Sequence, residues 1–106
     1  MIYNLTIATL DGCNFCNKFK DLLLSERIKF KELVCDKDPG FCDNLESYTS
    51  CDLYPMAILD TSSGLHITMC LTNDYQQINK TNKINEKNVI IYFHSINTML
   101  DFIKKV

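Results

Sequence analysis

The chain is poor in the residues that interrupt regular structure, and it has little excess charge. Of its 106 residues only three are glycine and two are proline, and tryptophan is absent. The net charge of −2 provides no basic surface for nucleic acid. No run of about 18 apolar residues is present to form a membrane span. We therefore expect a single domain over residues 1–106, with no nucleic-acid partner and no membrane association.

The start of the chain also has no basic segment followed by a long apolar stretch, so it does not resemble a secretory signal. On this basis we expect a cytoplasmic protein, and we expect it to be a monomer. In a reducing compartment the six cysteines are expected to be thiols plus one catalytic pair, rather than a disulfide scaffold.

Two of the cysteines form a C-x-x-C motif, Cys13-Asn14-Phe15-Cys16, between two predicted elements. Residues 2–9 alternate apolar and polar side chains as a strand does, and residues 15–26 have the pattern of an amphipathic helix. A helix N-terminus supplies unpaired N–H groups and partial positive charge, which favour a thiolate on Cys13. Because the thiolate attacks in disulfide exchange, the motif predicts a redox catalyst. The same spacing occurs in zinc sites, so half of a zinc site, or two structural thiols, remains an alternative.

The rest of the pattern predicts an α/β protein with a central mixed sheet of four to five strands and helices on both faces. The first strand, helix and second strand should form a crossover with parallel strands. Residues 72–88, rich in Asn, Gln and Lys, are expected to be a long solvated connection. A last strand over 89–94 is expected at an edge of the sheet. The other expected elements are strands over 30–35, 56–60 and 66–71, a short helix over 41–49, and a final helix capped by Ser95.

These residues resemble the glutaredoxin branch of the thioredoxin-like fold. The C-x-x-C motif is similar to the family's Cys-Pro-Tyr-Cys, and Lys20 stands where many members have lysine. Tyr54-Pro55 and the strand that follows resemble the segment that brings a cis-proline up to the active cysteines. The resemblance covers roughly residues 1–71. It implies a thioredoxin-like fold and a thiol–disulfide oxidoreductase that uses a dithiol mechanism on glutathione or protein disulfides.

The resemblance also implies roles for individual residues. Cys13 would be the nucleophile and Cys16 the resolving thiol. Pro55 would shape a groove in which the backbone of Tyr54 pairs with the substrate chain. The remaining candidates for binding substrate or glutathione are Phe15, which is otherwise a core residue, and Lys20, which with Lys18 is otherwise part of a solvated helix face. We predict no metal ligands.

The chain departs from the family pattern at three places. Asn14 replaces the proline within the motif, a change that we expect to alter the redox potential. Asp11-Gly12 stands where the family has a basic residue, and a carboxylate there opposes thiolate formation. Thr68 and Met69 replace a Gly-Gly pair that lets the backbone approach glutathione. The alternatives are therefore a thioredoxin-type carrier that serves specific protein partners without glutathione, or a non-enzymatic redox-sensing or zinc-binding module.

The other four cysteines have no recognisable motif. Cys35, Cys42 and Cys51 are spaced by seven and nine residues, which does not fit a zinc ribbon. We interpret them as packed or loosely exposed thiols, with a Cys35–Cys42 disulfide formed under oxidation as the alternative. Cys70 is expected to be buried in a strand. His66 and His94 are expected to be exposed strand residues.

Overall fold

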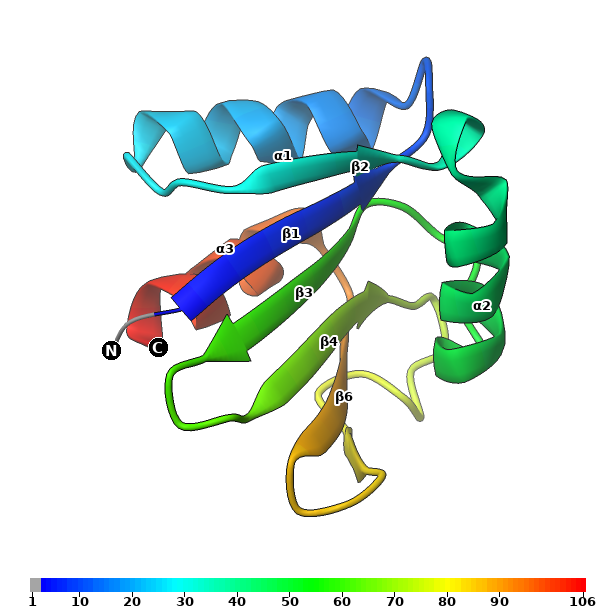
Figure 1. Cartoon of the computed structure of the whole chain (residues 1–106), viewed down its shortest axis with the longest axis vertical. Coiled ribbons are helices and arrows are strands. Elements are labelled where there is room, and N and C mark those ends of the chain that lie inside the picture. The colour runs from blue at the N-terminus through cyan, green and yellow to red at the C-terminus, as the bar shows by residue number, and fades with distance from the viewer. Residues whose placement is uncertain (1–2) are drawn as a thin grey trace.

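A six-stranded mixed sheet with helices on both faces makes up the fold (Figure 1). The computed structural model describes residues 3–106, so position 2, the expected start of the first strand, lies outside the described residues. The strand order is β2-β1-β3-β4-β6-β5. The elements are β1 (Tyr3–Thr9), α1 (Asn14–Ser25), β2 (Lys31–Val34), the 3-10 helix η1 (Cys35–Lys37), α2 (Pro39–Thr49), β3 (Met56–Thr61), β4 (His66–Leu71), β5 (Thr81–Lys83), β6 (Asn88–Phe93) and α3 (Ile96–Lys105).

The strand pairing in the first half of the chain includes the predicted crossover. β1 pairs in parallel with β2, with Thr9 opposite Val34, which confirms the expected crossover through α1. β3 then pairs antiparallel with the other side of β1, and β4 pairs antiparallel with β3. Because β1 and β2 are parallel, their carboxyl ends meet at one end of the sheet, and α2 lies beside that end (Figure 1).

Two predictions about the second half of the chain were wrong. Residues 72–88 contain β5, which pairs antiparallel with β6, and the sheet therefore has six strands. β6 lies between β4 and β5, parallel to β4, so β5 and not the last strand occupies the edge. β5 consists of exposed polar residues and so has no apolar periodicity to mark it. Two backbone hydrogen bonds extend this pairing beyond β5: the Asn79 N–H donates to the Tyr92 carbonyl at 2.8 Å, and the Tyr92 N–H donates to the Lys80 carbonyl at 3.2 Å.

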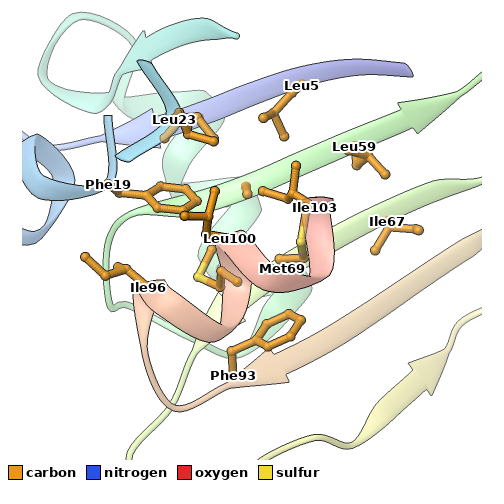
Figure 2. Packing of buried hydrophobic residues seen from close by; sticks show 13 residues of the cluster. Leu5, Phe19, Leu23, Leu59, Ile67, Met69, Phe93, Ile96, Leu100 and Ile103 are labelled. Atoms are coloured by element: carbon orange, nitrogen blue, oxygen red, sulfur yellow. The ribbon is translucent and has the colours of Figure 1, made fainter. Parts of the chain in front are cut away.

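Helices α1 and α3 pack on one face of the sheet and form the main core (Figure 2). Phe19 and Leu23 of α1 are fully buried, four residues apart on one side of the helix. The hydroxyl of Ser95 accepts a hydrogen bond from the Thr98 N–H at 3.2 Å, which confirms Ser95 as the N-cap of α3. The rest of this core consists of Leu5, Ile7, Ala57, Leu59, Ile67, Met69, Phe93, Ile96, Met99, Leu100 and Ile103.

Helix α2 belongs to the opposite face and is tied to the sheet by two tyrosines. The Tyr54 hydroxyl donates to the Glu46 carboxylate at 2.7 Å, and the Tyr92 hydroxyl donates to the Thr49 carbonyl at 2.8 Å. A second buried cluster forms between α2 and this end of the sheet. It consists of Ala8, Cys16, Cys35, Cys42, Leu45, Tyr54, Met56 and Ile58. Three of the six cysteines therefore belong to this cluster, and two more, Cys13 and Cys51, pack against it.

Candidate active site

The C-x-x-C motif begins at the turn between β1 and α1. Gly12 has φ +74°, a conformation that side chains rarely adopt, and it delivers Cys13 to the N-cap of α1. The Cys13 sulfur accepts a hydrogen bond from the Cys16 N–H at 3.1 Å. It thus satisfies one of the amides that a helix leaves unpaired at its N-terminus. A sulfur in this place would be stabilised as a thiolate by that N–H group and by the helix dipole.

Cys13 and Cys16 are joined in a disulfide, with their Cα atoms 5.2 Å apart. Cys13 is half-buried, whereas only 1% of the Cys16 surface is exposed. A molecule in solution can therefore approach Cys13 but not Cys16. This asymmetry is the one that separates an attacking thiol from a resolving thiol.

The Tyr54–Pro55 peptide bond is cis, as the family resemblance implied, and it leads into β3. The Tyr54 carbonyl oxygen lies 3.9 Å from the Cys13 sulfur. The Tyr54 ring is buried, and its hydroxyl is bonded to Glu46. Burial, followed by this hydrogen bond, raises the pKa of Tyr54 well above its ordinary value. Tyr54 therefore presents its backbone, and not an ionisable hydroxyl, beside the cysteine pair.

A groove of about 370 Å³ adjoins the motif. Phe15 is 60% exposed and lines this groove, so it is not a core residue. The Lys18 ammonium lies 5.8 Å from the centre of the Phe15 ring, within the range of a cation–π contact. The other lining residues come from three connections, the end of β4 and the start of α3: Leu53, Tyr54, Leu71, Thr72, Asn73, His94, Ser95, Ile96 and Asn97. A larger hollow of about 830 Å³ lies on the α2 face; neither hollow is lined by a cysteine, but only the smaller one is lined by a residue of the motif, Phe15.

Lys20 has a partner of its own. Its ammonium lies 2.9 Å from the Glu32 carboxylate, which also accepts a 2.8 Å hydrogen bond from the Thr9 hydroxyl. The bond from Lys20, and then that from Thr9, holds the pKa of Glu32 below its ordinary value. Lys20 does not line the groove beside the motif. Its role in substrate binding stays a prediction, and Lys18 is the lysine that the groove contains.

The departures from the family pattern have clear structural settings. Thr68 and Met69 are fully buried within β4, where they pair with β6 on one side and β3 on the other. Both edges of β4 are therefore occupied by strands at this position. Asp11 is exposed, and its backbone N–H donates to the Asp36 carboxylate at 3.0 Å. This bond joins the turn before the motif to η1.

The interpretation of Cys35 and Cys42 as thiols was wrong, because the structure joins them in a second disulfide. Helix η1 and the start of α2 turn the chain back on itself, which brings the two Cα atoms to 5.6 Å, within ordinary disulfide range. Cys51 and Cys70 are outside any disulfide. Cys70 is buried in β4 as predicted, and Cys51 packs against the cluster that contains it. Burial is the main cause that raises the pKa of each thiol.

The two histidines differ from each other. His66 lies in β4 as predicted, but it is half-buried and pairs with Asp60 on β3. His94 is exposed and follows β6 rather than belonging to it. Within residues 3–106 no three His, Cys, Asp or Glu side chains are grouped so that they could hold a metal ion. No helix in the same part of the chain is both long and apolar enough to span a membrane.

A C-x-x-C pair at a helix N-terminus, set against a cis-proline that leads into a strand, defines a thioredoxin-like protein. The glutaredoxin family model matches residues 5–61, which is more than half of the chain, and the chain belongs to this family. The match includes both disulfides and ends with β3. Among curated proteins no match was found.

Proposed function

We propose that the protein is a dithiol oxidoreductase that reduces or exchanges disulfides through Cys13 and Cys16. The observation that carries the proposal is the asymmetry of the pair. Cys13 is accessible at the N-cap of α1, and Cys16 is buried one helical turn further on. The membership of the glutaredoxin family supports the same chemistry.

Catalysis begins with the reduced pair. The Cys13 thiolate attacks one sulfur of a substrate disulfide, and the other substrate sulfur leaves as a thiolate that takes up a proton. The Cys16 thiol then loses its proton and attacks the Cys13 sulfur. The second half of the substrate leaves as a thiol, and the Cys13–Cys16 disulfide forms. Two electrons have then passed from the pair to the substrate.

Glutathione is the proposed reductant and the first substrate class. The groove beside the motif is near the lower end of the range of small-molecule sites, about 300–1,000 Å³. Phe15 provides an apolar wall, and Lys18 provides positive charge for a carboxylate of the tripeptide. The backbone of Tyr54 would pair with the substrate chain beside the Cys13 sulfur. Pro55 would hold this segment in place, and Lys20 remains a candidate for a more distant contact.

A protein-specific electron carrier is the second candidate, and the setting of β4 favours it. Thr68 and Met69 occupy the place of the family's glycine pair, and they are enclosed by β3 and β6. The backbone at this position would then make no contact with glutathione. In this case the pair would exchange electrons with protein disulfides alone.

The test is turnover of a mixed disulfide of glutathione and a small thiol, with glutathione as the only reductant. We expect the wild-type protein to turn over and Cys13→Ser to lose nearly all activity. Cys51→Ser is the matched control, because Cys51 is a half-buried thiol outside the motif. Wild-type turnover in Cys13→Ser would refute the proposal. If glutathione supports no turnover but a protein disulfide is reduced, the carrier is the correct function.

A further inference from the structure

The second disulfide is closed off from solvent. Cys35 and Cys42 are only 4% and 3% exposed, in η1 and in the first turn of α2. A dissolved thiol therefore has no direct path to either sulfur in the folded protein. The residues between them are also held by other bonds, since the Asp38 carboxylate caps α2 by accepting from the Phe41 N–H at 3.3 Å. The two cysteines are seven residues apart, so the disulfide closes a short loop. A disulfide adds less to the free energy of unfolding when the loop that it closes is short.

The same disulfide belongs to the buried cluster that also contains Cys16 of the active pair. Cys35 directly follows β2 and the motif follows β1 after a three-residue turn, and the parallel register sets Thr9 opposite Val34. The bond from the Asp11 N–H to the Asp36 carboxylate ties the two connections together at 3.0 Å. Cys16, Cys35 and Cys42 belong to one buried cluster, and Cys13 packs against it. The buried thiol of the active pair thus faces the same apolar interior as the second disulfide.

We propose that Cys35–Cys42 is a second redox couple, reduced from inside the protein by Cys16. This proposal rests on the proposed function, because it uses the reduced Cys13–Cys16 pair as its electron source. The wild-type protein would then store four electrons when fully reduced, two in each pair. The substrate of this internal exchange is the Cys35–Cys42 disulfide itself.

The exchange balances without any further reactant. The Cys16 thiolate attacks one sulfur of the Cys35–Cys42 disulfide, and the other sulfur leaves as a thiolate. The Cys13 thiolate then attacks the Cys16 sulfur, which re-forms Cys13–Cys16 and releases the second thiolate. Two protons, those that Cys13 and Cys16 gave up, go to Cys35 and Cys42. Two electrons have moved from the active pair to the second pair.

Cys51 is the competing attacker, because it also packs against the cluster. Burial raises the pKa of its thiol, which lowers the fraction present as the attacking thiolate. Cys70 is buried more deeply, and its pKa is raised as well. Cys16 is buried as well, but its partner Cys13 can attack the Cys16 sulfur and complete the exchange, so we assign the step to Cys16.

The experiment follows both disulfides in the oxidised, folded protein during reduction by dithiothreitol. Samples are quenched with iodoacetamide, and the alkylated cysteines are quantified by peptide mass spectrometry. Wild type is compared with Cys16→Ser, with Cys13→Ser/Cys16→Ser and with the control Cys51→Ser, after circular dichroism has verified that each is folded. Dithiothreitol reduces the active pair whether or not glutathione is a substrate, so the result is independent of glutathione use.

We expect Cys35–Cys42 to be reduced in wild type and in Cys51→Ser, after a lag that matches reduction of the active pair. In the two variants without Cys16 its reduction should be at least about tenfold slower, because an intramolecular attack is replaced by a bimolecular one on a buried bond. Equal rates in all four proteins would overturn the proposal. So would a wild-type protein in which Cys35–Cys42 stays oxidised after Cys13–Cys16 is reduced. If Cys51→Ser were the only variant in which Cys35–Cys42 is no longer reduced after the lag, the step would belong to Cys51, and the proposal would be overturned as well.

Discussion

The Cys13 sulfur lies 3.9 Å from the carbonyl oxygen of Tyr54, although 41 residues separate them in the chain. The contact exists because β3 runs antiparallel to β1, so the start of β3 lies beside the end of β1. A substrate bound at Cys13 would therefore lie beside the backbone of Tyr54. This arrangement makes the groove lined by Phe15 and Lys18 the expected path.

Removing the Phe15 ring should impair substrate use without affecting stability. The ring is 60% exposed, so we expect Phe15→Ala to change the free energy of unfolding by no more than about 0.5 kcal/mol. The loss of its apolar contact with substrate should lower kcat/KM by about fivefold, equivalent to about 1 kcal/mol. Leu24→Ala is the matched control, since Leu24 is 64% exposed on the same helix and does not line the groove. An equal fall in kcat/KM for both variants would contradict the assignment of Phe15.

The two lysines of α1 should differ in what their removal changes. Lys18→Met removes the positive charge from the groove, so we expect a higher KM for glutathione mixed disulfides at low ionic strength. Lys20→Met breaks the exposed ion pair with Glu32, which is worth about 1 kcal/mol or less in the free energy of unfolding. Steady-state kinetics at two salt concentrations would separate these effects. A KM that rises only in Lys20→Met would make Lys20, and not Lys18, the lysine that binds substrate.

The attachment of α2 to the sheet can be tested at Tyr92. Tyr92→Phe removes the buried hydrogen bond to the Thr49 carbonyl and leaves that oxygen without this donor. We expect the free energy of unfolding to fall by about 1–2 kcal/mol, measured by urea denaturation. Tyr75→Phe is the control, because Tyr75 is almost fully exposed and should change stability little. Equal stability of the two variants would mean that the Tyr92 hydroxyl contributes nothing.

Stability should fall at alkaline pH. The pKa values of Cys51 and Cys70 are raised in the folded protein, mainly by burial, whereas thiols in the unfolded chain titrate near about 8.5. Above that pH the unfolded chain binds fewer protons than the folded protein, so the free energy of unfolding decreases as pH rises. Urea midpoints between pH 8 and 10, measured without reductant, test this. The urea midpoint should fall less steeply with pH in Cys51→Ala than in wild type. A wild-type midpoint that does not change between pH 8 and 10 would contradict the burial of these thiols.

Stability should also fall at acid pH, through Glu32. Its pKa is lowered in the folded protein, first by the bond from Lys20, so the unfolded chain takes up a proton near about pH 4.3 before the folded protein does. The stabilising contribution is present above that pH and is lost as pH falls through the folded pKa. Glu32→Gln should have a smaller loss of stability below pH 5 than wild type. If the free energy of unfolding falls equally below pH 5 in both proteins, the ion pair has no such effect.

Much of the first half of the fold could be predicted, because its signals are local. The alternation in β1, the amphipathic pattern of α1 and the C-x-x-C motif between them are all contiguous in the chain. Pro55 was assigned through the family resemblance, since no local pattern distinguishes a cis-proline from a trans one.

The rest of the structure depends on contacts between distant residues. β5 is held by backbone pairing with β6, and its polar side chains carry no periodic signal. The Cys35–Cys42 disulfide depends on the turn made by η1, and Phe15 continues an apolar helix pattern although it points to solvent. The sequence alone reveals that Thr68 and Met69 replace the family's glycines. It does not reveal that β6 pairs with β4 beside them. Spacing alone cannot supply such contacts.

Trapping of the mixed disulfide in Cys16→Ser tests the central claim most directly. Without the resolving thiol, the adduct between the protein and glutathione should accumulate when the variant meets a glutathione mixed disulfide. Peptide mass spectrometry should then find glutathione on Cys13, in about one equivalent. If glutathione is found on Cys51 and not on Cys13, or if neither glutathione nor a protein disulfide forms an adduct on Cys13 in the folded variant, Cys13 is not the nucleophile and the account is wrong.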